Sequence, residues 1–199
     1  EIEGLTHSFG ENLLYKNAGF TLNRGEHIGI VGQNGTGKST LIKICTEQII
    51  PDSGRIVWQP NTTIGYLDQY AEIDHTLTMK EFLKSAFTKL FEMEAQALQL
   101  YEKAADGDMK SLELAARYQE QLEAHDFYSI DTAIDRVANG LGLLAIGLDR
   151  PIAEMSGGQR AKVILAKLLL EKPDVLLLDE PTNFLDKDHV SSLKDSFTK

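Results

Sequence analysis

Residues 32–40 read "GQNGTGKST" and carry the residue types that surround the phosphates of a nucleotide. Gly32, four further residues, Gly37, Lys38 and Ser39 reproduce the full spacing of a phosphate-binding loop. Glycines are required there because the backbone wraps closely around phosphate and aims its amides inward, where side chains would collide. We predict that Lys38 contacts the β- and γ-phosphates and that the Ser39 hydroxyl ligates Mg²⁺. The predicted binding residues of the loop are Gly32, Gln33, Asn34, Gly35, Thr36, Gly37, Lys38, Ser39 and Thr40.

An acidic pair follows an apolar run near the end of the chain, in "VLLLDEPTNFLD" at residues 175–186. Four apolar residues predict a buried parallel strand, and Asp179 comes at its carboxyl end, where ligands gather in α/β sheets. We predict that Asp179 holds the Mg²⁺ ligand shell and that Glu180 is the general base that polarises an attacking water. Taken alone, such a pair is often a solvated strand end, but the complete phosphate loop upstream favours the functional interpretation.

A second glycine turn, "EMSGGQR" at residues 154–160, opens a helical run. The start of a helix exposes unpaired amides and the positive end of a dipole of about half a charge, so this turn could bind an anion. The phosphate loop, however, already surrounds the phosphates of one nucleotide. We therefore infer that Ser156, Gly157, Gly158 and Gln159 bind the γ-phosphate of a nucleotide held by another domain of the same kind.

The elements that must position these residues predict an α/β fold. Segments rich in β-branched and aromatic residues, separated by turn residues, predict strands at 2–5, 19–22, 27–31, 55–58 and 63–66. The segment "HIGIVG" runs from the predicted strand 27–31 into the glycine loop and then into a predicted helix at 38–50, the order of a nucleotide-binding unit. We expect a phosphate-loop NTPase core with an antiparallel β subdomain and an inserted α-helical hairpin.

The insertion begins at Thr78, which has capping-box spacing to Glu81 and precedes apolar residues at helical intervals up to Tyr101. An Asp-Gly turn separates this run from a second predicted helix at about 110–125, and a third is predicted at 131–141. We expect one domain over 1–199. Its expected parts are a β subdomain and phosphate-loop core at 1–77, a helical subdomain at 78–142 with the hairpin at about 78–126, and a segment at 143–199 with the glycine turn and the acidic pair.

Composition excludes several classes of protein. The formal charge of −10 disfavours non-specific binding to nucleic acid, because such affinity comes mostly from Lys and Arg neutralising phosphates. The single cysteine, Cys45, rules out a disulfide framework and fits a reducing cytoplasm. No apolar stretch reaches the length of a membrane span, so we expect no direct membrane insertion and a cytoplasmic location.

The order of phosphate loop, glutamine, "SGGQ" and a strand ending in Asp-Glu resembles an ATP-binding-cassette (ABC) domain over nearly the whole chain. The resemblance implies ATP and Mg²⁺ as cofactors and a second cassette as partner. It also implies that Gln69 in "GYLDQ" contacts Mg²⁺ and the attacking water, that Phe9 in "HSFG" stacks on adenine, and that Asp186 crosses to the partner domain. Alone, Phe9 would be a core residue and Gln69 a surface amide.

Three features resemble the soluble F subfamily, whose members carry two cassettes in one chain. "DEPTNFLD" is close to that group's "EPTNHLD", with Phe184 in place of the histidine; the stretch 69–156 is long enough to hold an inserted hairpin; and "GYLDQ" follows the phosphate loop after a short interval. The resemblance implies an ATPase that acts on the ribosome or its tRNA, in some members conferring antibiotic resistance. The hairpin carries more acidic than basic residues, so any RNA contact would use a few placed side chains.

Two other functions stay open. The chain could be the ATPase subunit of a membrane transporter, with 69–156 docking a permease, or a nucleotide-gated clamp in which hydrolysis only resets binding. The family places a further histidine on a strand after the Asp-Glu pair, and His189 lies too close to Asp186 for that role. We therefore expect a fragment of a longer protein that hydrolyses ATP slowly when alone, with its second cassette in the same native chain or in a homodimer.

Overall fold

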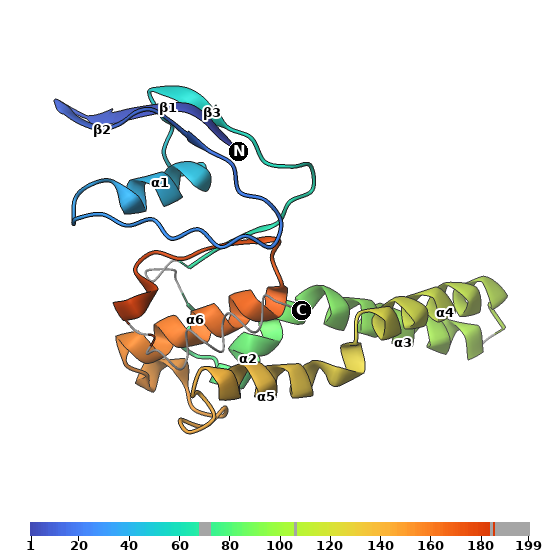
Figure 1. Cartoon of the computed structure of the whole chain (residues 1–199). Helices are drawn as coiled ribbons and strands as arrows, with labels where there is room; N and C mark the ends of the chain where they lie inside the picture. The colour runs from blue at the N-terminus through green and yellow to red at the C-terminus, as the bar shows by residue number, and fades with distance from the viewer. Residues whose placement is uncertain (68–72, 106, 184, 186–199) are drawn as a thin grey trace. The chain divides into compact units, whose positions relative to one another are not determined.

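The computed structural model describes residues 1–67, 73–105, 107–183 and 185, and the chain divides into two compact units (Figure 1). The described part of unit 1 is residues 1–67 and 173–183. The described part of unit 2 is residues 73–105, 107–172 and 185. The phosphate loop and the acidic pair belong to unit 1, whereas the Ser-Gly-Gly turn belongs to unit 2.

Unit 1 contains a three-stranded antiparallel sheet in the order β2–β1–β3. Its strands are β1 (Ile2–Phe9), β2 (Asn12–Phe20) and β3 (Ser53–Ile56). Gly10, at φ 57°, makes the tight turn that places Asn12 opposite Phe9. Helix α1 (Lys38–Cys45) buries Leu41 and Ile44 against Ile2 and Leu5 of β1, so the core of the unit lies between sheet and helix.

A second, parallel pair joins β4 (Ile64–Tyr66) to β5 (Val175–Leu177), at two segments where strands were predicted. The strand before Asp179 was predicted to be buried, but β5 is half-buried. The pair is anchored at its start by Asp174, whose Oδ2 accepts hydrogen bonds of 2.8 Å from both the amide and the hydroxyl of Thr63. These bonds hold the pKa of Asp174 below its usual value. Only Leu178 separates the end of β5 from the acidic pair Asp179 and Glu180, so the anchored strand leads into that pair.

The prediction of a strand at 27–31 is wrong: this segment forms no strand and leaves Val31 95% exposed. An apolar parallel strand is stable when neighbouring strands bond it and helices cover both faces. Within the described residues β4 pairs only with β5, so the segment has no place in that ladder. The helix predicted to reach residue 50 is also shorter, because Glu47 takes a left-handed φ of 60° and turns the chain after Cys45.

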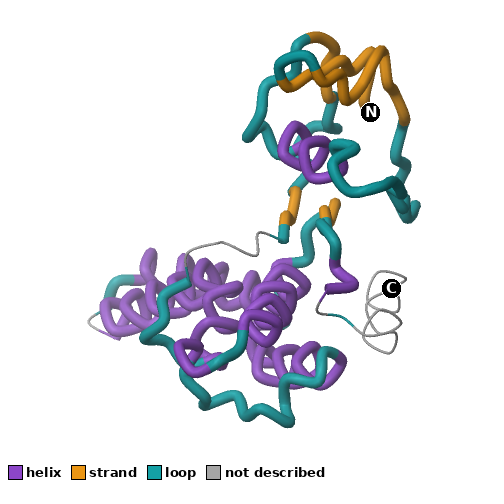
Figure 2. The backbone as a smooth tube through the Cα atoms, turned by 90° about the vertical axis from the view of Figure 1, so that its left-hand side faces the viewer, coloured by secondary structure: helices purple, strands orange, loops and turns teal. Residues whose placement is uncertain are grey.

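The described part of unit 2 consists of helices and loops (Figure 2). Its α-helices are α2 (Met79–Lys84), α3 (Thr88–Ala105), α4 (Met109–Ala124), α5 (Ile130–Gly140) and α6 (Gly157–Glu171), with short 3₁₀ turns at Ser85–Phe87, Phe127–Ser129 and Ile152–Glu154. The capping box of Thr78 and Glu81 is confirmed at the start of α2. The predicted single run after it is broken, because a 3₁₀ turn separates α2 from α3.

Helices α3 and α4 form the expected antiparallel hairpin (Figure 1). Asp108 caps α4 by accepting hydrogen bonds from the amides of Lys110 and Ser111. Ala97, Ala115 and Leu122 are buried along the hairpin. Helix α6 is the central helix of this unit: it contacts both α2 and α5, and Val163, Leu165 and Ala166 on it are fully buried. Its first turn is therefore held on a rigid support.

Candidate nucleotide-binding site

In the phosphate loop of unit 1, polar side chains donate hydrogen bonds to carbonyls of the same loop. The Lys38 ammonium donates hydrogen bonds to the carbonyls of Gly32 at 2.9 Å and Gln33 at 3.0 Å. The Thr36 hydroxyl donates to the same Gln33 carbonyl at 2.8 Å. Helix α1 begins directly after Gly37, whose φ of 99° lies in the left-handed region and which supplies no side-chain cap. The first amides of α1 are thus left for a ligand, as expected at an anion site.

Strand β2 supports the phosphate loop through the side chain of Tyr15. The Tyr15 hydroxyl donates a hydrogen bond to the Gly37 carbonyl, and burial raises the pKa of that hydroxyl. A Cβ at Gly37 would lie 2.6 Å from the Tyr15 oxygen, so any side chain there would push the loop off its support. Glycine is therefore required at this position by both backbone conformation and close packing.

A cavity of about 290 Å³ brings three of the predicted groups together in unit 1. Its lining residues are Phe9, Asn12, Leu14, Asn34, Gly35, Gly37, Lys38, Ser39, Thr40 and Glu180. Phe9 stands at the end of β1 with 54% of its surface exposed, so its ring is available to a flat ligand. The cavity therefore combines an aromatic surface, a cationic glycine loop and a carboxylate, which suits a nucleotide.

The acidic pair is shaped by the turn that follows β5. Glu180 has a left-handed φ of 45°, a conformation that costs about 1–3 kcal/mol in a non-glycine residue. The turn holds it there, because the amide of Asn183 donates to the Glu180 carbonyl and its side-chain amide donates to Glu180 Oε2, each at 3.1 Å. Asp179 is partly buried and does not line the cavity.

Sequence reasoning missed Tyr15 and Asn183, which support the loop and the carboxylate. Asn12 and Leu14 also line the cavity, because the β1–β2 turn folds them back beside Phe9. A hairpin signal was present in Gly10, whereas no local signal marked Tyr15, which reaches the loop from a strand more than twenty residues earlier.

The site also fits Mg²⁺ in the manner of an NTPase. No group of three His, Cys, Asp or Glu side chains capable of holding a metal by itself occurs among the described residues. Mg²⁺ is commonly bound by one or two protein oxygens together with substrate phosphates. Of the residues predicted to ligate it, Ser39 lines the cavity, whereas Asp179 does not. The predicted site residues Gln69 and Asp186 lie outside the described residues.

The Ser-Gly-Gly turn starts α6 in unit 2 with a second capping box. The Gln159 amide donates to the Ser156 hydroxyl oxygen at 3.2 Å, and the Ser156 amide donates to Gln159 Oε1 at 2.9 Å. Gln159 was predicted to bind phosphate, but its side-chain oxygen and its amide are thus already used in hydrogen bonds within the turn. Ser156, Gly157 and Gly158 are exposed, and a Cβ at Gly157 would meet no heavy atom within 4 Å outside its own helix. Within the described residues, no close contact requires glycine at Gly157.

Comparison with known proteins places the chain in one family. The family model described as "ABC transporter" matches residues 15–183. The chain is 45% identical over 97% of its length to the ABC transporter ATP-binding protein YfmM of Bacillus subtilis. It is 34% identical over 98% of its length to ABC transporter F family member 5 of Arabidopsis thaliana. It is 38% identical over 91% of its length to the energy-dependent translational throttle protein EttA of Escherichia coli K12.

These matches cover only part of each relative: 38% of YfmM, 29% of the Arabidopsis protein and 33% of EttA. The chain thus spans about a third of the length of the curated relatives it matches. Among solved structures, the ATP-binding subunit of an ABC transporter superposes with a TM-score of 0.67 at 19% identity, over 99% of this chain and 74% of that one, and shows the same fold. None of the described helices is long and apolar enough to cross a membrane. The chain therefore belongs to the ABC transporter family of ATP-binding proteins, and its relatives include F family members.

Proposed function

We propose that residues 1–199 form one incomplete cassette, divided near 77 and 142, and that two such cassettes enclose ATP and hydrolyse it with Mg²⁺. The observation that carries this proposal is the exposed first turn of α6. It offers helix amides and two glycines to an anion, while the chain's own phosphate loop lies at the start of a different helix. Because one loop already serves one nucleotide, the second turn has a use when a partner presents its ATP.

The residues of this chain take distinct roles in that reaction. Lys38 holds the β- and γ-phosphates with the amides of the loop, and Phe9 stacks on the base. Glu180 accepts a proton from the attacking water, in a position held by Asn183. Ser39, Asp179 and Gln69 would hold Mg²⁺, which would supply positive charge to the transferring phosphoryl group. Asp186 contacts the partner cassette, whose Ser-Gly-Gly turn completes the site.

We further propose that closure of the two cassettes in the cytoplasm drives a conformational change on the ribosome. EttA is by name a translational throttle, and the hairpin of α3 and α4 offers an extended surface for a partner. Leu98, Met109 and Leu112 are exposed on that hairpin. Apolar side chains exposed beside acidic ones favour contact through a few placed groups rather than through a basic face.

Replacement of Glu180 by glutamine tests the proposal, because the amide cannot act as a base and should leave the ATP-bound closed state trapped. The E180Q chain is expected to co-sediment with ribosomes in ATP and Mg²⁺ but not in ADP. A matched E180Q/K38A chain, which has lost the ammonium of the phosphate loop, should remain unbound. Co-sedimentation with membrane vesicles instead would favour the ATPase subunit of a transporter. If E180Q and the parental chain co-sedimented equally with ribosomes and with vesicles, Glu180 would not be the base.

A further inference from the structure

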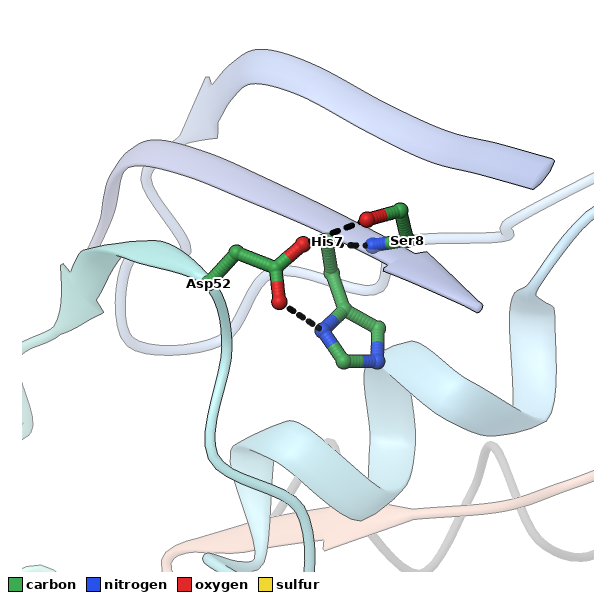
Figure 3. Close-up of polar contacts among 3 residues, drawn as sticks. All are labelled: His7, Ser8 and Asp52. Carbon is green, nitrogen blue, oxygen red and sulfur yellow. Dashed lines mark hydrogen bonds and ion pairs between the residues drawn. The ribbon is translucent and has the colours of Figure 1, made fainter. Parts of the chain in front are cut away.

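Strand β1 contains a buried histidine that the proposed reaction does not use. His7 is 5% exposed, and neither of its ring nitrogens makes a hydrogen bond within the described part of the chain. Its nearest charged group is Asp52, with Oδ1 at 3.6 Å from Nδ1 (Figure 3). That separation is an ion-pair distance but is too long for a hydrogen bond. A purely structural core position would be filled at lower cost by an apolar residue.

Asp52 is itself held firmly beside β1. Its other oxygen, Oδ2, accepts hydrogen bonds from the Ser8 amide at 2.9 Å and the Ser8 hydroxyl at 2.6 Å. These bonds, led by that of the hydroxyl, keep the pKa of Asp52 below its usual value. Residue 52 directly precedes β3, so the carboxylate ties β1 to the segment that leads into β3 and presents a negative oxygen to the imidazole.

The imidazole also contacts the aromatic side chain that lines the nucleotide cavity. The His7 and Phe9 rings are 4.9 Å apart between centroids, with an interplanar angle of 81°, an edge-to-face contact. The contact joins two residues of the same strand, so His7 supports Phe9 along β1. Phe9 is otherwise half exposed at the strand end, where a free ring would change rotamer readily.

We infer that His7 is a positioning residue for the purine base: Asp52 orients its imidazole, and the imidazole holds the Phe9 ring in the orientation that receives the base. The inference rests on the proposed role of Phe9. It predicts that His7 contributes to binding through the base and not through the phosphates, which separates it from a residue that merely stabilises the fold.

The test compares the affinity of the full chain for ATP with that for inorganic tripolyphosphate, which contacts only the phosphate loop. His7→Ala is expected to weaken ATP binding about three- to tenfold and to leave tripolyphosphate binding unchanged. His7→Phe, which keeps a ring against Phe9, should restore most of the loss. In a Phe9→Ala background, His7→Ala should cause no further loss of ATP affinity.

Each outcome has a definite meaning. An equal loss for both ligands, or a further loss in the Phe9→Ala background, would overturn the positioning role. If Phe9→Ala left ATP affinity unchanged, the base site of the proposed function would fail; if Phe9→Ala weakened ATP alone while His7→Ala did not, only this inference would fail. Should His7→Ala unfold, Asp52→Asn removes the charge beside Nδ1 and leaves an oxygen for Ser8, and a smaller loss specific to ATP is expected; no loss would contradict the inference.

Discussion

The two glycine turns of the chain both start helices, yet they leave those starts in different states. At α1, Gly37 supplies no side-chain cap and the lysine ammonium folds back on the carbonyls of its own loop. At α6, Ser156 and Gln159 satisfy each other in a capping box before any ligand arrives. An uncapped start leaves its first amides for a ligand, whereas the capped start of α6 is stable without one, as binding of a partner's nucleotide under the proposed function requires.

Removal of the ammonium at the phosphate loop should have the largest effect. Lys38→Ala is expected to weaken ATP binding by about one to two orders of magnitude, because hydrogen bonds to charged phosphates contribute about 1.5–3 kcal/mol. Titration calorimetry of the single chain measures this loss of ATP affinity. The same variant should keep an intact α6 turn, so it should still complete the site of a normal partner; if it could not, the two turns would not be independent.

A carboxylate at the second turn should affect assembly and not binding. Gly157→Glu places an anion where an added Cβ meets no described atom within 4 Å outside its own helix, and the helix dipole tolerates a negative charge at that end. We expect the thermal midpoint to be unchanged or slightly raised, ATP affinity of the single chain to be kept, and ATP-dependent association of E180Q chains to weaken by about tenfold or more. Association at the parental level, measured by sedimentation velocity, would show that this turn meets no phosphate.

The two capping boxes of unit 2 provide a matched pair. Ser156→Ala and Thr78→Ala each remove the hydroxyl of a box, so each should lower the free energy of unfolding by about 1 kcal/mol. Only Ser156→Ala should also weaken ATP-dependent association, since only that turn is proposed to meet a nucleotide. Urea unfolding together with sedimentation velocity separates the two effects, and equal losses of association would reduce the α6 turn to a structural cap.

The smallest expected effect is a difference between the two capping boxes in how stability depends on pH. Glu81 accepts hydrogen bonds from the amide and hydroxyl of Thr78, which lower its pKa from the ordinary value of 4.5. A lowered folded-state pKa gives stability that is present above 4.5 and is lost as pH falls through the folded value. Gln159, which has the place of Glu81 in the other capping box, has no titratable group. Glu81→Gln should therefore reduce the loss of stability between about pH 6 and about pH 3.5, measured as the shift in urea midpoint; an unchanged loss would assign it to other carboxylates.

What could be predicted from the sequence was local. The capping box at Thr78, the helix after the phosphate loop and the strand before Asp179 depend on residues close together in the chain, and each forms where it was expected. The start of β2 at Asn12 was not predicted, because "NLLYKN" shows no clean alternation and its partner strand decides its pairing. The strand expected at 27–31 failed for the same reason, since a strand exists only with a partner.

The supports of the site were also beyond local patterns. Tyr15 reaches Gly37 from another element, and Asp52 meets His7 across forty-five positions of sequence. A carboxylate before a glycine turn looks like ordinary turn chemistry until the fold brings β1 beside it. Motifs thus indicated which groups carry the chemistry, and tertiary contacts determined which groups hold them in place.

Complementation between two inactive chains tests the central claim of a shared site most directly. The K38A chain lacks a working phosphate loop but keeps its Ser-Gly-Gly turn, and the G157E chain has the reverse defect. Retention of labelled ATP after dilution, with Glu180→Gln in both chains to prevent turnover, is expected to be short for either chain alone. In a mixture, one complete site forms per pair, so ATP should be retained at about half the parental stoichiometry. If the mixture released ATP as fast as G157E alone, or if G157E alone retained it fully, the two turns would not share a nucleotide.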